Sequence, residues 1–198
     1  MELTLPKPIA IGRWWFQNRS LSPLPLLVLL FFVNPDFEMN FELFLLGAIG
    51  VVAAEALRLW AVSYAGSGTR TRGDKVYQLA VGGPYQWTRN PLYIANVVLY
   101  TSFAFLFGHI ILSVFAVLYF VLQYSYIVIF EESLLAESFG RGYKDYCASV
   151  PRWFLGQRLP VVAPSGTSDL RAAFRSEKST LISIGVMWLL WVTRFIWR

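Results

Sequence analysis

Two clusters of polar side chains interrupt a chain that is otherwise unusually apolar. The first contains Arg89, Tyr93 and Asn96, which fall at positions i, i+4 and i+7 and therefore share one face of a helix. The second is the adjacent carboxylate pair Glu131 and Glu132. Arginine and carboxylate groups that meet at neighbouring helix ends can bind a charged ligand and orient a reacting group. A simple belt of polar residues at a membrane edge is the alternative interpretation.

Two apolar stretches, 91–108 and 110–130, must position these clusters. The turn between them, Gly108-His109, is so short that the two helices have to be antiparallel neighbours. We therefore expect Arg89 and the Glu131-Glu132 pair to lie at the same end of the bundle. His109 then lies at the opposite end, where we expect it to be an ordinary turn residue.

The composition indicates a membrane protein. Of the 198 residues, 56% are hydrophobic and 15% are charged, which is too apolar for an ordinary soluble domain. Several apolar runs approach or exceed the ~18–20 residues that cross a bilayer. We predict an all-α, polytopic bundle of about five transmembrane helices that forms a single membrane domain over residues 1–198.

The charge distribution predicts the topology. The N-terminal segment and the connections 66–90 and 131–178 are basic, whereas the connection 34–42 is acidic. This alternation fits five spans with the N-terminus inside, so the polar clusters should face the cytoplasm, in a bacterial or archaeal membrane. No signal peptide is evident. Topology also accounts for the net charge of +5, so we expect no nucleic-acid partner.

Three further stretches should complete the bundle. Residues 24–33 are predicted as a transmembrane helix that starts at Ser22-Pro23, with a half-inserted helix as the alternative because the run is short. Residues 41–65 form a clear span. A polar connection over 155–178 precedes a last span at 179–197.

Glu55 and Arg58 lie three residues apart in the 41–65 span and share a helix face. They are either a self-neutralising pair near the helix end or the support of a polar pocket inside the bundle. The sequence offers few side chains that commonly bind metal ions, since Cys147 is the only cysteine and His109 the only histidine. We expect no metal site.

An amphipathic helical segment follows the carboxylate pair. Gly140 is expected to bend it, and Pro151 to end it. Its apolar residues recur at intervals of three and four: Leu135, Phe139, Tyr143, Tyr146 and Val150.

The two clusters form a two-part motif: Gly83-Pro84-Tyr85-x3-Arg89-Asn90-Pro91-x-Tyr93, followed about 40 residues later by Glu131-Glu132-x2-Leu135-x3-Phe139-Gly140-x2-Tyr143-x2-Tyr146-x3-Val150-Pro151-Arg152. This motif resembles the isoprenylcysteine carboxyl methyltransferase and phospholipid methyltransferase superfamily of integral membrane methyltransferases. The resemblance covers roughly residues 45–155 and leaves 179–197 as an extra C-terminal span.

The resemblance implies a methyltransferase that binds S-adenosylmethionine at the cytoplasmic end of the bundle. A carboxylate would attract the sulfonium cation, Arg89 or backbone donors would suit the methionine carboxylate, and aromatic and apolar side chains would hold the adenine. The implied cofactor-binding residues are Leu79, Val81, Gly83, Tyr85, Asn90, Pro91, Tyr93, Asn96, Glu131 and Glu132.

The catalytic residues implied by the resemblance are Arg89, Glu132 and Arg152. The methyl acceptor should be lipophilic, either similar to an isoprenylcysteine carboxylate or a small hydrophobic molecule, and should enter sideways from the lipid. Either arginine could orient a carboxylate acceptor, whereas Glu132 would take the proton from an amine or thiol. The family usually carries histidine at the position of Asn90, and asparagine cannot titrate, so we expect Asn90 to position groups.

Two alternatives share parts of this pattern. Membrane sterol and steroid reductases, which use NADPH, have a similar Arg-x-Pro-x-Tyr helix start, here Arg89 to Tyr93. A non-enzymatic membrane protein on the same scaffold is the second. The Glu131-Glu132 pair and the ending Val150-Pro151-Arg152 favour methyl transfer. The sequence does not indicate an oligomeric state.

Overall fold

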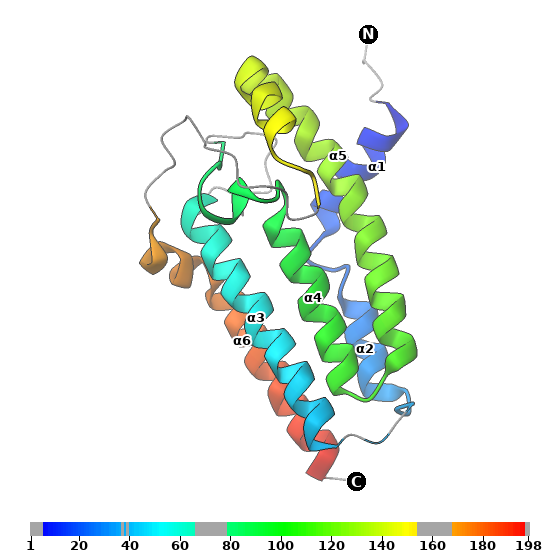
Figure 1. The fold of residues 1–198 in the computed structure, drawn as a ribbon. Helices are drawn as coiled ribbons and strands as arrows, with labels where there is room; N and C mark the ends of the chain where they lie inside the picture. Colours follow the sequence, from blue (N-terminus) through cyan, green and yellow to red (C-terminus); the bar gives the residue numbers. More distant parts are fainter. Residues whose placement is uncertain (1–5, 37, 39, 66–78, 154–167, 197–198) are drawn as a thin grey trace.

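The described part of the protein is an all-α bundle without strands (Figure 1). The computed structural model describes residues 6–36, 38, 40–65, 79–153 and 168–196. Residues 66–78 of the predicted basic connection 66–90 lie outside these residues, as do residues 155–167 of the predicted polar connection 155–178. The helices are α1 (Lys7–Asn18), α2 (Leu24–Phe32), α3 (Phe41–Ala65), α4 (Pro91–Leu106), α5 (Ile110–Ser149) and α6 (Leu170–Ile196), with a 3-10 turn, η2 (Gly83–Gln86), before α4.

Two helices, α3 and α5, are long and apolar enough to cross a bilayer. Only 22% of the most apolar stretch of α3 and 33% of that of α5 is buried within the chain. The core helix of a soluble protein would hide most of such a stretch, whereas these helices present large apolar side chains outward. The protein is therefore an integral membrane protein, although five spans are not established by helix length and composition.

The helix predicted over 24–33 is shorter than a full span. Helix α2 has nine residues and is therefore about 14 Å long, about half the ~30 Å hydrocarbon core. This length favours the half-inserted alternative. Ser22 does not cap the helix as expected: its hydroxyl donates to the Arg19 carbonyl at 3.0 Å and accepts from Gln123 Nε2 at 2.8 Å.

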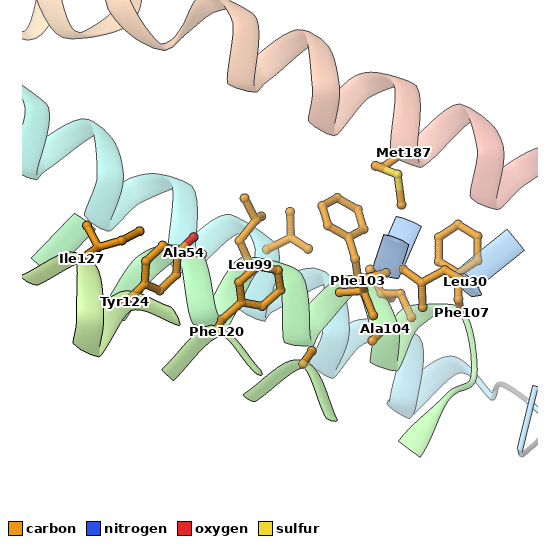
Figure 2. Close-up of a cluster of buried hydrophobic side chains, with 14 of the residues drawn as sticks. Leu30, Ala54, Leu99, Phe103, Ala104, Phe107, Phe120, Tyr124, Ile127 and Met187 are labelled. Carbon is orange, nitrogen blue, oxygen red and sulfur yellow. The ribbon is translucent and has the colours of Figure 1, made fainter. Parts of the chain in front are cut away.

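The apolar core runs along the middle of the bundle (Figure 2). Phe103, Phe120 and Ile127 are almost completely buried between α4 and α5, and Met187 reaches the same cluster from α6. The core therefore contains side chains from α1 through α6, with Phe16 contributed by α1. Its members include Leu30, Val51, Ala54, Leu99, Phe103, Ala104, Phe107, Phe120, Tyr124, Ile127 and Met187.

The tight α4–α5 turn is confirmed, and it places the predicted clusters at the same end of the bundle. Asp36 fixes the turn, because its backbone N–H donates to the Gly108 carbonyl at 2.7 Å and its carboxylate accepts from the Ile111 N–H at 3.0 Å. His109 lies in this turn, at the opposite end from the clusters as expected, and its side chain is fully buried.

Helix α5 bends sharply at Gly140, as predicted. The residue has φ +50° and ψ −116°, a conformation that glycine adopts readily because it lacks a Cβ. The chain then folds back toward α4 (Figure 1), and the predicted apolar stripe packs as one cluster. Tyr143, Tyr146 and Val150 are buried there against Val81. The fold-back brings residues 150–152 beside the start of α4.

Helix α6 begins about ten residues earlier than predicted. Residues 170–178 were expected to belong to a polar connection, but they form the first turns of the helix. The Asp169 carboxylate accepts from the Ala172 N–H at 2.9 Å and so caps the helix start. The charges of these turns did not exclude a helix, because Glu177 finds a buried partner and most of the other charged side chains remain exposed.

Candidate active site

The N-terminal end of α4 and the middle of α5 meet at a cavity of ≈ 530 Å³. Side chains from the family-like motif form one side of it, and residues from α1, α3 and α6 form the rest. The residues that line it are Phe16, Arg19, Ser20, Arg58, Val62, Ala65, Leu79, Ala80, Tyr85, Arg89, Asn90, Pro91, Leu92, Tyr93, Asn96, Leu99, Tyr100, Tyr124, Glu131, Glu132, Leu134, Leu135, Tyr143, Tyr146, Glu177, Ser179 and Thr180.

The η2 turn presents Tyr85 to the cavity. The Tyr146 hydroxyl, from the folded-back part of α5, donates to the Tyr85 carbonyl at 2.7 Å. Burial raises the pKa of Tyr85 above its ordinary value, with a smaller contribution from Glu131, so this phenol remains neutral. Tyr85 therefore offers an aromatic face and a hydroxyl rather than a charge.

The segment after α5 is joined to the segment before α4 by three hydrogen bonds. The Arg89 N–H donates to the Pro151 carbonyl at 3.0 Å. The Thr88 hydroxyl and the Asn90 side-chain amide donate to the Arg152 carbonyl at 3.2 and 3.0 Å. The Asn90 side chain thus makes no helix-cap hydrogen bond at the start of α4, and its amide holds the returning chain instead.

Glu132 lies between two arginines. Its Oε1 is 3.0 Å from Arg89 Nη1, and its Oε2 is 2.5 Å from Arg152 Nη2. Burial alone would lower the pKa of Arg89, but Glu132 keeps it above its ordinary value, so Arg89 is a cation. Arg89 Nη1 also donates to Cys147 Sγ at 2.6 Å. The carboxylate is thus held in one orientation.

An aromatic wall extends from Glu131 into the bundle. The Tyr93 hydroxyl hydrogen-bonds to the Glu131 carboxylate. The Tyr93 ring stacks on Tyr124 with centroids 4.7 Å apart, and Phe120 continues the stack toward Tyr100. Tyr93, Tyr100 and Tyr124 all line the cavity, so this wall offers flat apolar faces next to a carboxylate.

The side of the cavity opposite the motif is a buried polar network centred on Arg58. Arg58 Nη2 is 2.7 Å from Glu177 of α6, and Arg58 Nε is 3.4 Å from Glu55. Arg58 also donates to the Asn96 side-chain carbonyl and, at 3.3 Å, to the Thr180 hydroxyl. The structure favours the pocket-support interpretation of the Glu55 and Arg58 pair over a surface pair.

Nine of the predicted site residues line the cavity together, and three do not. Val81 is buried in the cluster with Tyr143, Gly83 packs against the Tyr64 ring, and Arg152 lies behind Glu132 with 43% of its side chain exposed. Arg152 is therefore connected to the cavity through its ion pair with Glu132. The nine are Leu79, Tyr85, Arg89, Asn90, Pro91, Tyr93, Asn96, Glu131 and Glu132.

Several lining residues were not found from the sequence. Tyr100 lies at i+7 from Tyr93, so the helical period could have indicated it. Arg19 lies in the basic N-terminal segment of the sequence, and Glu177 in the predicted polar connection 155–178. Only the packing of α1 on α5 and of α6 on α3 brings these two residues to the cavity.

Within the described ranges, no group of three or more histidine, cysteine, aspartate or glutamate residues could hold a metal ion. Two proteins that are similar to this chain bear names that refer to metal resistance. The chain is 30% identical over 150 residues to the nickel-cobalt-cadmium resistance protein NccN of Alcaligenes xylosoxydans xylosoxydans, which covers 76% of this chain and 61% of that protein. It is 29% identical over 109 residues to the cobalt-zinc-cadmium resistance protein CzcN of Cupriavidus metallidurans. This match covers 55% of this chain and 47% of CzcN.

The chain thus spans about half to three fifths of the length of these curated relatives. No solved structure matches it. A family model described as "Phospholipid methyltransferase" matches residues 43–142, which include α3, α4 and the carboxylate pair of α5. These matched residues cover half of the chain and contain the centre of the cavity. The protein therefore belongs to the phospholipid methyltransferase family.

Proposed function

We propose that the protein transfers a methyl group from S-adenosylmethionine to a lipophilic acceptor, and that the reaction takes place in the cavity between α4 and α5. One observation carries this proposal: Arg89, Tyr93, Glu131 and Glu132 converge on a single cavity, and all four lie in the family-matched region. The arrangement combines a fixed cation, two carboxylates and an aromatic wall.

The lining fits the chemistry of the methyl donor. A cavity of ≈ 530 Å³ is within the ~300–1,000 Å³ that small-molecule sites usually enclose. Arg89 Nε is buried and has no hydrogen-bond partner among the described residues, so it can donate to a bound ligand. S-adenosylmethionine supplies an electrophilic methyl group on a sulfonium cation. Glu131 and Glu132 would attract that cation, and Tyr85 and Tyr93 would hold the adenine.

Glu132 is the group that can act on the acceptor. Arg89 and Arg152 fix both of its oxygens, so the carboxylate needs no reorganisation during the reaction. An amine or thiol acceptor would lose its proton to Glu132 as it attacks. A carboxylate acceptor would need orientation only, and Arg89 would provide it. Asn90 holds the returning chain rather than exchanging protons.

A lipophilic acceptor follows from the surroundings of the cavity. Its deeper wall consists of Leu99, Tyr100 and Tyr124, and the outer sides of α3 and α5 are apolar. An acceptor dissolved in the membrane could therefore enter between helices without leaving an apolar environment. We also propose that the cavity faces the cytoplasmic side of the membrane, because the stretches of sequence that precede η2 and follow α5 are rich in arginine and lysine.

Calorimetric titration of the purified, detergent-solubilised protein tests this proposal. We expect S-adenosylmethionine and S-adenosylhomocysteine to bind and NADPH not to bind. Binding of NADPH alone would instead support a membrane reductase. Binding of none of the three would leave a non-enzymatic protein. The Arg89→Met variant should bind both adenosyl ligands more weakly. Arg141→Met, which changes an exposed arginine beyond the Gly140 bend, should bind them as the parent does.

We further propose that methyl transfer contributes to metal tolerance, because both curated relatives bear resistance names. Cells that depend on this protein should lose tolerance to cobalt or cadmium when it is deleted. Wild-type protein should restore growth, and the Glu132→Gln variant should not. Equal rescue by both proteins would mean that metal tolerance does not depend on the Glu132 carboxylate.

A further inference from the structure

Arg19 brings an additional arginine to the cavity from outside the family-matched residues 43–142. It is the residue that follows α1, and its side chain is half-buried. The sequence motif does not include Arg19. Among the described residues, Arg19 forms no ion pair with Glu131 or Glu132.

Tight packing of α1 on α5 fixes the position of Arg19. A Cβ on Gly12 would overlap the Tyr126 carbonyl and the Phe130 side chain, so glycine allows the two helix backbones to approach closely. One turn later, the Phe16 ring packs on Phe130 with centroids 5.5 Å apart. The Arg19 guanidinium then lies 3.9 Å from the centre of the Phe16 ring.

Most hydrogen-bond donors of Arg19 remain available. Within the part of the chain that the structure describes, its one hydrogen bond is a long one, 3.4 Å, from Nη1 to the Phe16 carbonyl, and it forms no ion pair. A guanidinium group has five N–H donors. The other two arginines of the cavity are engaged: Arg89 with Glu132 and Cys147, and Arg58 with Glu177.

Glu131 is the nearest acidic partner, and it stays apart from Arg19. The two charges act on each other, and both side chains line the cavity, yet they make no ion pair within 4.0 Å among the described residues. Tyr93 orients the Glu131 carboxylate from one side. A ligand that carried only an anion would be repelled by Glu131. A ligand with an anion and a cation on neighbouring atoms would satisfy both residues.

We propose that Arg19 and Glu131 bind a zwitterionic α-amino-acid group, with Arg19 holding its carboxylate and Glu131 its ammonium. This inference rests on the proposed function, in which the methyl donor carries such a group. It moves the main carboxylate contact from Arg89 to Arg19, on a helix that the family match does not include. An acceptor that carries an amino acid is the other source of the same chemistry.

Binding of matched ligand pairs to the full chain tests the assignment. S-adenosylhomocysteine has the amino-acid group, and 5′-methylthioadenosine keeps the adenosine and sulfur without it. Arg19→Gln and Arg19→Met remove the charge, and methionine preserves an apolar contact with Phe16. We expect both variants to bind S-adenosylhomocysteine about 10- to 100-fold more weakly and methylthioadenosine unchanged. Arg13→Gln, on the exposed side of the same helix, should bind both ligands as the parent does.

A second pair of ligands tests whether Arg19 binds the methyl acceptor or the methyl donor. S-octylcysteine has an amino-acid group on an alkyl chain, and octyl methyl sulfide has only the chain. Selective loss of S-octylcysteine binding in the Arg19 variants would assign the residue to the acceptor. Unchanged binding of both amino-acid ligands in folded Arg19→Gln or Arg19→Met protein would overturn the inference. If the parent binds neither adenosyl ligand, the proposed function fails, and the cysteine pair still decides the role of Arg19.

Discussion

Arg58 of α3 and Glu177 of α6 form an ion pair of 2.7 Å in which the Glu177 side chain is only 1% exposed. Arg58 belongs to the family-matched region and Glu177 lies beyond it. The pair is therefore one of the polar contacts that join the family-matched residues to α6, together with the Trp191 indole N–H that donates to the Leu106 carbonyl. Because Arg58 also contacts Asn96 and Glu55, its charge is shared among three helices.

Removal of the Glu177 carboxylate should destabilise the protein. Glu177→Gln leaves a buried arginine with only Glu55 as its charged partner among the contacts described above, and loss of one member of a buried pair costs about 3 kcal/mol. We expect a lower thermal unfolding midpoint in detergent, measured by tryptophan fluorescence. Glu137→Gln, on an exposed position of α5, should leave the midpoint unchanged. Equal midpoints for the two variants would mean that the pair does not hold α6.

Glu132 and Arg152 should both matter for turnover, and Glu132 more. Glu132→Gln removes the charge that both arginines hold, and we expect kcat for methyl transfer to fall about 100-fold. Arg152→Ala should lower kcat less, about 10-fold, because Arg89 still orients Glu132. Initial rates with a radiolabelled methyl donor measure both effects. Normal rates in these variants, with unchanged thermal midpoints, would remove Glu132 from the mechanism.

The bend in α5 should depend on glycine at position 140. A Cβ at Gly140 would meet no atom within 4 Å, so any cost of Gly140→Ala comes from its φ of +50° and not from crowding. We expect a loss of about 1–3 kcal/mol in the free energy of unfolding. Gly142 has equally open surroundings and no positive φ, so Gly142→Ala is the matched control and should be neutral or stabilising. Similar effects of both substitutions would contradict the strain argument.

Close packing of α1 on α5 should be sensitive to one methyl group. Gly12→Ala places a Cβ against the Tyr126 carbonyl, and the helices must separate to accept it. We expect a loss of about 1–3 kcal/mol in stability and weaker binding of S-adenosylhomocysteine, since Arg19 moves with α1. Gly185→Ala in α6 is the control, because its Cβ would meet nothing within 4 Å. Parent-like ligand binding by Gly12→Ala would show that α1 is not a wall of the site.

Local patterns in the sequence predicted which polar side chains meet at the cavity. The spacing of Arg89, Tyr93 and Asn96 and the short turn at Gly108 determine which side chains share a face and which ends meet. Tyr93 and Glu132 could have been found at opposite ends or separated by packed leucine side chains, and instead both line one cavity. Hydrophobic periodicity and helix-turn geometry were sufficient for this part of the structure.

The outer walls could not be predicted in the same way. Arg19 and Glu177 are charged residues in segments that resemble an interface and a polar connection. Their burial depends on contacts between helices that are far apart in the sequence, such as α1 with α5 and α3 with α6. Asn90 directly precedes α4, where an asparagine side chain commonly caps a helix. The competing acceptor, the Arg152 carbonyl, reaches it only after the chain has folded back at Gly140.

The cavity is lined by residues as early as Phe16 and as late as Thr180. During synthesis, Glu131 and Glu132 therefore enter the membrane well before α6, which forms the last wall of the cavity. A chain that ends before α6 lacks the wall that Glu177, Ser179 and Thr180 form, so its cavity is open on that side. Ligand affinity should thus arise late in biogenesis, and chains truncated before residue 170 should be inserted in the membrane yet inactive.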